Sequence, residues 1–380
     1  MTGGDGVTLF LCGDVMTGRG VDQILPHPGG AHLYESSVRD ARQYVALAEA
    51  HSGRVPAPVA PEYIWGDALA ELSRVGPDAR VINLETSVTS SDDYWRGKGI
   101  NYRMHPENVA CLTAARSDVC GLANNHVLDY GYEGLVETLD VLSRAGLKTA
   151  GAGRTLAQAR APAVVPLRDG ASVAVFAVAD GSSGVPAEWG ARDDRPGVDR
   201  LPDLSDATVA ALARRIDRLR APRPIVLASI HWGSNWGYDV PREHVRFARR
   251  LVDVGVDIVH GHSSHHPRPI EVYRDRLILY GCGDFVNDYE GIEGHERYRS
   301  DLVVMYFVTV DAGSGALAVV RLSPMRTKKL QVVRAAGADA AWVREALDRI
   351  STPFGVRVDP GPDGQLSVRW SGEDGRHHPR

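Results

Sequence analysis

Cysteine is scarce in this chain of 380 residues, which holds four cysteines and no CxxC pair. So few cysteines exclude a disulfide framework and a cysteine-ligated zinc site, and they favour a reducing compartment. Long apolar runs are lacking as well. The apolar run at residues 7–12 is too short for a membrane span or a signal-peptide core, and no basic residue precedes it. We therefore expect a cytoplasmic protein with no membrane partner.

Excess positive charge is also lacking. The chain has 48 Asp and Glu residues against 43 Lys and Arg residues, which gives a formal net charge of -5. This balance provides no basic field for a nucleic-acid backbone, so nucleic acid is not an expected partner. The length allows one large α/β domain or a main domain with an appendage. The sequence leaves open whether the chain forms a homo-oligomer.

Short apolar runs enriched in β-branched residues recur along the chain, with helical patterns between them. Strands are predicted at 7–14, 79–85, 118–125, 173–180, 224–233, 257–262, 277–285, 302–311 and 316–324. Helices are predicted at 133–147 and 242–255, where apolar residues recur at spacings of three and four. The alternation predicts an α/β protein. Because the last strands follow one another without helices, we expect a mixed sheet.

The composition also indicates how the chain is divided. Segments 25–62 and 181–222, rich in Pro, Gly, Asp and Arg, are predicted to be long surface excursions. We assign residues 1–330 to the main domain. Residues 331–380 are expected to form a small C-terminal extension with one helix, a hairpin-like stretch and a loose tail.

Polar side chains follow successive predicted strands at the point where each strand ends. Open α/β sheets bind ligands beyond these carboxyl ends. Carboxylate, amide and imidazole groups together suit divalent zinc, manganese or iron. Seven donors are more than one tetrahedral ion needs, so we predict two ions about 3.5–4 Å apart, bridged by a carboxylate and a water. The donors are Asp14, Glu85, Asn125, His126, His231, His262 and His265.

Each of these residues alone has a simpler interpretation. Asp14 could cap a helix or shape a turn, and His231 could be a hydrogen-bonded core histidine. Six of the 14 histidines fall between positions 231 and 266, and this clustering favours the joint metal site. His260 lies inside a predicted strand and is expected to be structural. His244, on a predicted helix, is expected at the surface.

The sequence resembles the CapA family of poly-γ-glutamate capsule biosynthesis proteins, within the calcineurin-like metallophosphatase superfamily. The resemblance runs from residue 7 to near residue 325, and it implies a four-layer α/β/β/α sandwich with a dinuclear metal site at the sheet edge. The motifs that carry it are "CGDVMTGR" (12–19), "NLETSVT" (83–89), "LANNHVLDYGYEGLVETLDVL" (122–142), "SIHWG" (229–233) and "GHSSHH" (261–266).

By position, the resemblance implies a set of metal ligands, with Glu85 as the bridge and His126 as the acid that protonates the leaving group. Many relatives carry HPH where this chain has SSHH, so the choice among His262, His265 and His266 for the last two ligands stays open. Met16 stands where the superfamily has a histidine, which leaves one metal position a ligand short. The implied ligands are Asp14, Glu85, Asn125, His231, His262 and His265.

The chain also departs from the family outside its metal motifs. We expect no membrane anchor of the kind typical of the capsule proteins, and we therefore do not expect a surface capsule subunit. In "GCGDF" (281–285), where relatives more often show "LGNF", neither Asp284 nor Cys282 receives a role.

The neighbourhood of His126 suggests how its proton is controlled. Asp129, three residues on, either holds the imidazole in one tautomer or caps the following helix. Arg19, one turn beyond Asp14, is a candidate contact for a substrate anion, and Trp236 is a candidate pocket wall.

A cationic loop at 92–108 interleaves Arg96, Lys98 and Arg103 with aromatic residues. Such a loop beside a metal pair would suit a phosphate or carboxylate ligand with an organic portion. An ordinary solvated loop explains the same pattern equally well.

Two functions from different classes remain. The main prediction is a metal-dependent hydrolase that acts on a phosphoester or a related polar bond. The alternative is an accessory factor for a glutamate-containing polymer or metabolite, which keeps the fold and the metal without hydrolytic turnover. In both cases the expected partner is an anionic small molecule or polymer.

Overall fold

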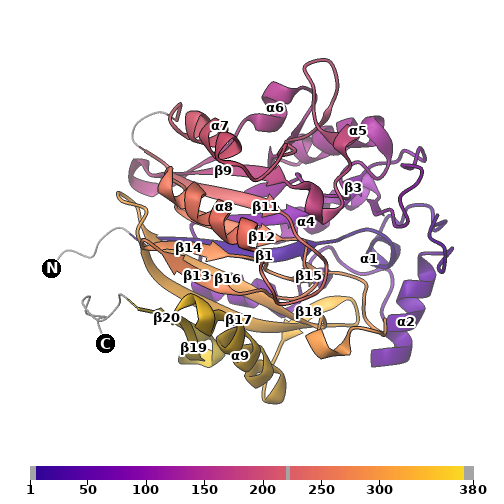
Figure 1. Cartoon of the computed structure of the whole chain (residues 1–380). Coiled ribbons are helices and arrows are strands. Elements are labelled where there is room, and N and C mark those ends of the chain that lie inside the picture. The colour runs from indigo at the N-terminus through magenta and orange to yellow at the C-terminus, as the bar shows by residue number, and fades with distance from the viewer. Residues whose placement is uncertain (1–5, 220–222, 372–380) are drawn as a thin grey trace.

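The apolar runs of the sequence become the central strands of two large sheets (Figure 1). The computed structural model describes residues 6–219 and 223–371. Both sheets mix parallel and antiparallel strand pairs, which confirms the α/β class and the expected mixed sheet. The predicted tail at 372–380 lies outside the described residues.

The ten-stranded sheet has the order β19-β20-β17-β16-β1-β2-β5-β6, with β15 paired to β1 and β18 paired to β17. Strands β1, β2, β5 and β6 are parallel neighbours, and β15 is also parallel to β1. The bounds are β1 (Gly6–Val15), β2 (Ala79–Leu84), β5 (Val119–Gly121), β6 (Lys148–Ala150), β15 (Asp284–Val286), β16 (Leu302–Asp311), β17 (Leu317–Lys328), β18 (Gln331–Arg334), β19 (Val356–Pro360) and β20 (Leu366–Trp370).

The six-stranded sheet has the order β13-β14-β12-β11-β9-β8, and its four middle strands are parallel. Its bounds are β8 (Ala163–Pro166), β9 (Ser172–Ala179), β11 (Ile225–His231), β12 (Ile258–His262), β13 (Ile270–Tyr273) and β14 (Arg276–Leu279). Two short pairs complete the strands: β3 (Ser87–Val88) with β4 (Arg103–Met104), and β7 (Ala152–Gly153) with β10 (Gly197–Val198).

Helices surround the sheets (Figure 1). In that view α7 and α8 lie on one side of the molecule and α9 lies on the other. Their bounds are α1 (Gly20–Ile24), α2 (Arg42–Ser52), α3 (Asp67–Val75), α4 (Ala110–Ala114), α5 (Gly131–Arg144), α6 (Leu156–Arg160), α7 (Asp206–Ile216), α8 (Arg242–Asp253) and α9 (Ala338–Ser351). Within the described ranges, none of these helices has the length and apolarity that crossing a bilayer requires.

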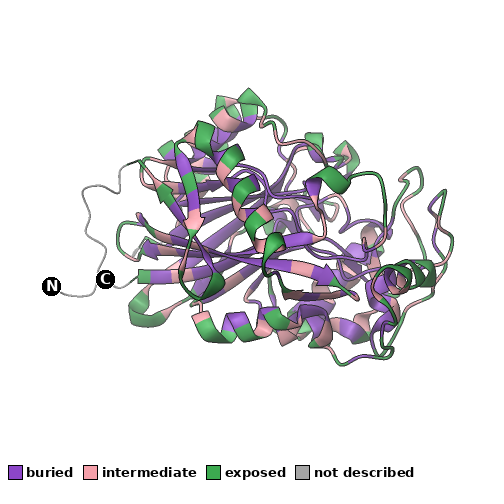
Figure 2. Ribbon diagram, turned by 90° about the horizontal axis from the view of Figure 1, so that it is seen from below, coloured by how far each residue is buried: buried purple, intermediate pink, exposed green. Residues whose placement is uncertain are grey.

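Strand β9 illustrates why the apolar runs that form the central strands are apolar on both faces. Val173 and Val175 belong to a core cluster that also contains residues of the ten-stranded sheet. Phe176 and Val178, which point the other way because side chains alternate along a strand, belong to a second cluster with residues of α7 and α8. Figure 2 shows buried strands in the interior and exposed faces on the helices.

The two predicted surface excursions contain helices. Segment 25–62 includes α2, and segment 181–222 includes α7. Helix α7 begins after Ser205, whose side chain accepts a hydrogen bond from the backbone N–H of Thr208. Its Val209 and Leu212 are buried. Segment 181–222 therefore contains an amphipathic helix, although its overall composition predicted an irregular surface segment.

The chain beyond residue 330 adds β18, α9 and the hairpin β19–β20. Strand β20 pairs with β17 and extends the ten-stranded sheet. The expected helix and hairpin are thus present. The predicted boundary falls between β17 and β18, which pair with each other. The division into two domains stays a prediction.

Close approach of β1 and β15 depends on glycine. A Cβ atom on Gly13 would lie 1.8 Å from the carbonyl oxygen of Gly283. The backbone N–H of Asp14 donates to the same carbonyl at 2.9 Å. A side chain at position 13 would separate the two strands, so this glycine lets Asp284 lie beside Asp14.

Candidate metal centre

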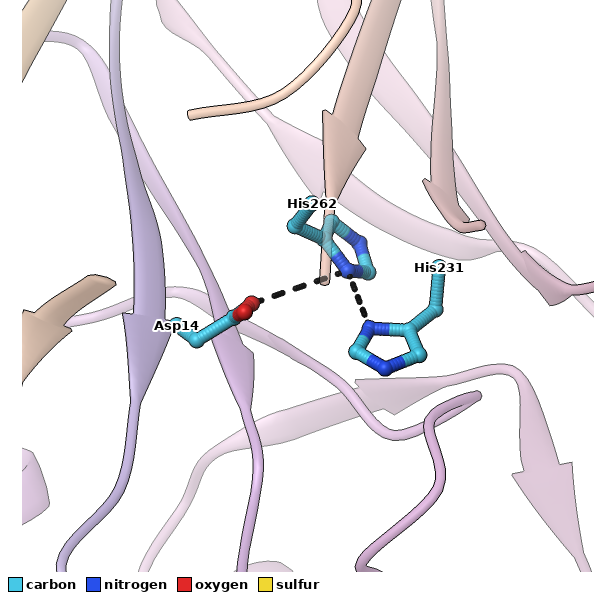
Figure 3. A group of neighbouring side chains, drawn as sticks. All are labelled: Asp14, His231 and His262. Atoms are coloured by element: carbon cyan, nitrogen blue, oxygen red, sulfur yellow. Dashed lines mark hydrogen bonds and ion pairs between the residues drawn. The ribbon is translucent and has the colours of Figure 1, made fainter. Parts of the chain in front are cut away.

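The carboxyl ends of strands from both sheets meet at one buried point (Figure 3). Asp14 comes from β1, His231 ends β11 and His262 ends β12. One ligand atom from each of these residues lies within 4.8 Å of the other two. The Nδ1 atoms of His231 and His262 are 2.8 Å apart, and His262 Nδ1 is 3.7 Å from Asp14 Oδ1. The structure therefore brings together three of the predicted ligands.

Glu85 and Asn125 lie next to this cluster. His231 Nε2 is 3.1 Å from Asn125 Oδ1 and 3.9 Å from Glu85 Oε1. Asn83, which the sequence analysis did not single out, donates from Nδ2 to Asp14 Oδ1 at 2.7 Å and to Glu85 Oε2 at 3.3 Å. Asn83 thus holds the two carboxylates in place. The sequence offered one signal for Asn83. It lies two positions before Glu85 in the predicted strand, and residues two apart along a strand face the same side.

The turn after His262 aims a backbone donor at the cluster. Ser263 has a φ of 102°, a value that non-glycine residues rarely adopt. In this conformation its N–H donates to Asp14 Oδ2 at 3.1 Å. Strained backbone of this kind persists where surrounding structure holds it, and it is common at functional sites.

The electrostatics of the cluster favour a bound cation. Burial raises the pKa of Asp14 to about 7, and the nearby negative charge of Asp284 contributes to the rise. Burial and the charge of Asp14 also raise the pKa of Glu85. Burial lowers the pKa of both His231 and His262, which keeps their imidazoles neutral with lone pairs available. Crowded carboxylates beside neutral imidazoles fit a divalent metal ion.

His265 is held beside the cluster by a different residue, Asp284. Its Nδ1 is 3.0 Å from Asp284 Oδ1, and its Nε2 is 3.0 Å from Asn235 Nδ2. Its ring centroid is 5.2 Å from those of Trp236 and Tyr289. Asp284 received no role from the sequence, and the run 277–285 that contains it was predicted as one strand. The structure divides that run into β14 and β15, and Asp284 begins β15.

The remaining histidines of the region are held elsewhere. His266 Nε2 accepts the backbone N–H of Gly237 at 3.1 Å, and its ring stacks on Tyr298. His260 Nε2 lies 2.7 Å from the carbonyl oxygen of Cys12, in agreement with the expected structural role. The expectation that His244 lies at the surface was wrong. The residue is 2% exposed and its ring stacks on Trp232, because α8 turns this face toward the six-stranded sheet.

Asp129 holds the ring of His126. Asp129 Oδ2 lies 2.5 Å from His126 Nδ1, so the Nδ1–H donates to the carboxylate and Nε2 keeps its lone pair. The capping alternative does not fit, because no side chain caps α5. His126 Nε2 is 3.7 Å from Glu85 Oε1. Burial lowers the pKa of His126 to about 4, so the free imidazole is neutral near pH 7. A neutral imidazole accepts at Nε2, and the implied role as an acid stays a prediction.

Lys98 lies inside the site. Its Nζ donates to Asp129 Oδ1 at 2.5 Å and to the carbonyl oxygen of Asn125. It is also 2.9 Å from His126 Nδ1. Lys98 therefore secures the His126–Asp129 pair from the 92–108 loop.

The other predicted substrate contacts have different surroundings. Arg103 pairs with Asp92 at 2.5 Å on the loop itself. Arg96 is exposed, with its guanidinium carbon 5.7 Å from the ring centroid of Tyr94. Trp236 borders the cluster through His265. Of the three cationic side chains in this loop, Lys98 is the one that reaches the centre.

Arg19 forms buried ion pairs with carboxylates of the protein itself. The residue is 3% exposed, and its guanidinium donates hydrogen bonds to Asp288, to Glu35 at 3.0 Å and to the Tyr44 hydroxyl at 2.9 Å. The expectation of an open anion contact does not fit this placement, because two carboxylates already neutralise the charge. The sequence could not reveal Asp288, which lies far along the chain.

Comparison with known proteins identifies the family. A family model described as "Bacterial capsule synthesis protein PGA_cap" matches residues 8–289. The chain belongs to this family. It is similar to a Mycobacterium tuberculosis protein named "Probable polyglutamine synthesis accessory protein", with 50% identity over 365 residues and 96% of each chain covered.

More distant relatives extend the same picture. The "PGA biosynthesis protein CapA" of Bacillus subtilis is 28% identical over 316 residues, which cover 83% of this chain and 71% of the relative. The "Capsule biosynthesis protein CapA" of Bacillus anthracis is 26% identical over 317 residues, with 83% and 67% covered. The resemblance to CapA is confirmed.

Proposed function

We propose that this PGA_cap chain is a metal-binding accessory factor in the synthesis of a glutamate- or glutamine-containing polymer. The buried cluster of Asp14, His231 and His262 carries the metal-binding part of this proposal. The relative from Mycobacterium tuberculosis, aligned over 96% of both chains, supports the accessory part. The comparisons thus favour the accessory role over the hydrolase that the sequence analysis puts first.

The fold is part of the proposal. The shared core between the two sheets and the helices outside them support a four-layer α/β/β/α sandwich of the metallophosphatase type. The described cysteines are all buried and unpaired, which supports the cytoplasm as the compartment.

Five residues would hold the metal: Asp14, Glu85, Asn125, His231 and His262. Manganese, zinc and iron all suit this mixture of oxygen and nitrogen donors. The bound ion would supply positive charge that offsets the carboxylates and attracts the oxygens of an anionic ligand.

The rim of the site supports an anionic polymer as the ligand. Trp236 and Tyr289 flank His265 at the cluster, and the exposed Arg96 extends from the neighbouring loop. Aromatic rings can pack against the carbon chain of a polymer while the metal and arginine attract its carboxylates.

Binding to synthetic γ-linked oligoglutamate and to oligoglutamine, measured by calorimetry in the presence of Mn²⁺, tests this function. We expect binding that EDTA abolishes and that Asp14→Asn weakens at least about tenfold. Asp140→Asn is the matched control, because Asp140 is a half-exposed surface residue paired with Arg154. Equal binding with and without metal would contradict the proposal.

A metal-dependent phosphoester hydrolase is the second candidate, and one observation favours it. The His126–Asp129 pair places His126 Nε2 3.7 Å from Glu85, where a proton can pass between the imidazole and a substrate oxygen. Turnover of p-nitrophenyl phosphate with Mn²⁺ or Zn²⁺ distinguishes the candidates. Turnover that disappears in both Asp14→Asn and His126→Asn would favour the hydrolase, whereas polymer binding without turnover would favour the accessory factor.

A further inference from the structure

We propose that the groove between α6 and α7 is a second binding site, which takes a small organic anion with an apolar body and a phosphate or carboxylate head. The groove lies on the outer side of the six-stranded sheet, where α6 and α7 are neighbours (Figure 1). Its volume is about 770 Å³. Cavities of this size are typical of small-molecule sites. The inference goes beyond the proposed function.

The floor of the groove is apolar. Phe176 of β9 and Leu212 of α7 line it, and both belong to the core cluster on this face of the sheet. The walls carry small side chains, Ala161 directly after α6 and Ala211 on α7. A floor of this kind favours an apolar part of a ligand, because water leaves the apolar surface when the ligand binds.

The charged side chains of the groove are mostly arginines. Two aspartates also line it, and both are already engaged. Asp203 accepts hydrogen bonds from the backbone N–H of Ser205 at 2.9 Å and from the Thr208 hydroxyl at 2.7 Å, at the start of α7. Asp199 is buried and pairs with Arg215 at 2.8 Å. The five arginines of the lining are Arg160, Arg200, Arg214, Arg215 and Arg218.

Three of these arginines keep a positive charge that no carboxylate offsets. Arg200 donates to the backbone carbonyl oxygens of Val185 and Leu201, which carry no charge. Arg214 and Arg218 are exposed, and within residues 6–219 and 223–371 their side chains have neither a hydrogen-bond nor an ion-pair partner. Guanidinium groups bind phosphate and carboxylate oxygens through paired N–H donors, so this excess of charge suits an acidic head.

Arg215 holds the groove in shape. Its guanidinium carbon is 5.1 Å from the ring centroid of Phe176, and its Nη2 donates to the carbonyl oxygen of Arg160 on α6. Together with the ion pair to Asp199, these contacts join α7 to α6 and to the floor. A groove that is already formed loses little conformational entropy when a ligand binds.

The groove is separate from the metal centre. None of the described residues that line it is a candidate metal ligand. The loop at 181–185 lies between the two sites. On one side its Val185 carbonyl accepts the Nε–H of Arg200 at 3.2 Å. On the other side the Ser183 hydroxyl donates to the carbonyl oxygen of His231 at 3.0 Å. Binding in the groove can therefore be measured with the metal removed.

The test measures the binding of four probes to the full chain in EDTA. Calorimetric titrations use octyl phosphate, octanoate, inorganic phosphate and octyl glucoside, each below the concentration at which it forms micelles. We expect one of the two octyl anions, or both, to bind at a single site, and the tighter one identifies the head. Inorganic phosphate lacks the apolar body and octyl glucoside lacks the charge, so each should bind at least about tenfold more weakly.

Two variants locate the site. The double variant Arg214→Gln, Arg218→Gln removes the two unpaired guanidinium groups and should weaken binding of the octyl anion at least about tenfold. Ala211→Trp fills the groove from α7 and should abolish binding. The matched control is Arg242→Gln, Arg246→Gln, which removes two exposed arginines, also four residues apart, from α8 and should bind like the wild type. Circular dichroism checks that each variant is folded.

Unchanged affinity in either groove variant would overturn the inference, because the anion would then bind elsewhere. Failure of both octyl anions to bind the wild type would also overturn it, and so would equal affinity for octyl glucoside. These results are independent of the metal centre. A chain that binds the octyl anion in this groove but holds no metal would contradict the proposed function and leave the inference intact.

Discussion

Two buried carboxylate sites in this molecule have opposite surroundings. Glu71, on α3, accepts hydrogen bonds from Arg74 at 2.7 Å, from Arg334 at 2.5 Å and from Gln365 at 3.0 Å. Burial alone would raise its pKa, yet the hydrogen bonds and charges of these partners lower the pKa of Glu71 to about 2. At the metal centre, burial and a second carboxylate raise the pKa of Asp14 to about 7.

The difference separates a structural site from a binding site. Around Glu71 the protein supplies its own cations, so folding alone completes the site. Around Asp14 the protein supplies more carboxylates and neutral imidazoles, an arrangement that suits the external cation we propose. Both sites contain buried carboxylates. They differ in whether the positive charge that offsets these carboxylates comes from the protein or, as we propose, from a bound ion.

Removal of Glu71 should have the largest effect on folding. Glu71→Ala leaves Arg74 and Arg334 without their shared partner and removes one of the two acceptors of the Gln365 amide, the other being the Ser323 hydroxyl. We expect a loss of about 2–4 kcal/mol in the free energy of unfolding, because buried polar groups lose their partners. Urea unfolding measures this loss. Metal affinity should be unchanged, and a parallel loss of metal affinity would show that the two sites are not independent.

Metal addition should stabilise the wild type by a similar amount. At a free Mn²⁺ concentration 100 times the dissociation constant, we expect about 2.7 kcal/mol. Asp14→Asn should lose this stabilisation. Without metal, Asp14→Asn should be at least as stable as the wild type, because one charge leaves a group of like charges. Thermal unfolding with Mn²⁺ and with EDTA measures both quantities. A metal-free variant much less stable than the wild type would point to a structural role for Asp14.

Acid should weaken the Glu71 site in a defined window. The pKa of Glu71 falls from an ordinary value of 4.5 to about 2 in the folded protein. A lowered folded-state pKa contributes stability above the unfolded value, and this stability is lost as pH falls from about 4.5 to about 2. Glu71→Gln removes this contribution. Urea unfolding at several pH values should therefore show a smaller difference between variant and wild type at pH 2 than at pH 5. A constant difference would contradict the assignment.

The smallest effect is expected at His266, the histidine that the structure places outside the cluster. His266→Gln keeps an acceptor for the N–H of Gly237 and loses the stacking on Tyr298. We expect a loss of about 1 kcal/mol in the free energy of unfolding. Calorimetric Mn²⁺ affinity should match that of the wild type. Loss of a bound ion in His266→Gln would mean that His266 is a ligand.

The sequence predicted those site residues whose position follows directly from the strand that precedes them. Asp14, His231 and His262 each follow an apolar run, and parallel strands bring such ends to one edge. The class of fold followed from the same runs. The asparagine at position 83 was within reach of this reasoning, since it lies on the predicted strand that leads to Glu85.

Long-range pairing explains what the sequence could not predict. Asp284 joins the site because β15 pairs with β1, a contact between residues about 270 positions apart, and no local pattern encodes that register. Lys98 reaches Asp129 from a loop whose path depends on the rest of the molecule. Arg19 looked available for substrate because the acids that neutralise it, Glu35 and Asp288, come from other segments.

The most direct test of the central claim is an anomalous-scattering map of crystals grown with Mn²⁺, combined with elemental analysis of the same protein. The account predicts density between Asp14, His231 and His262, within ligand distance of all three. No anomalous density at this point, in protein equilibrated with Mn²⁺, Zn²⁺ and Fe²⁺ in turn, would contradict it.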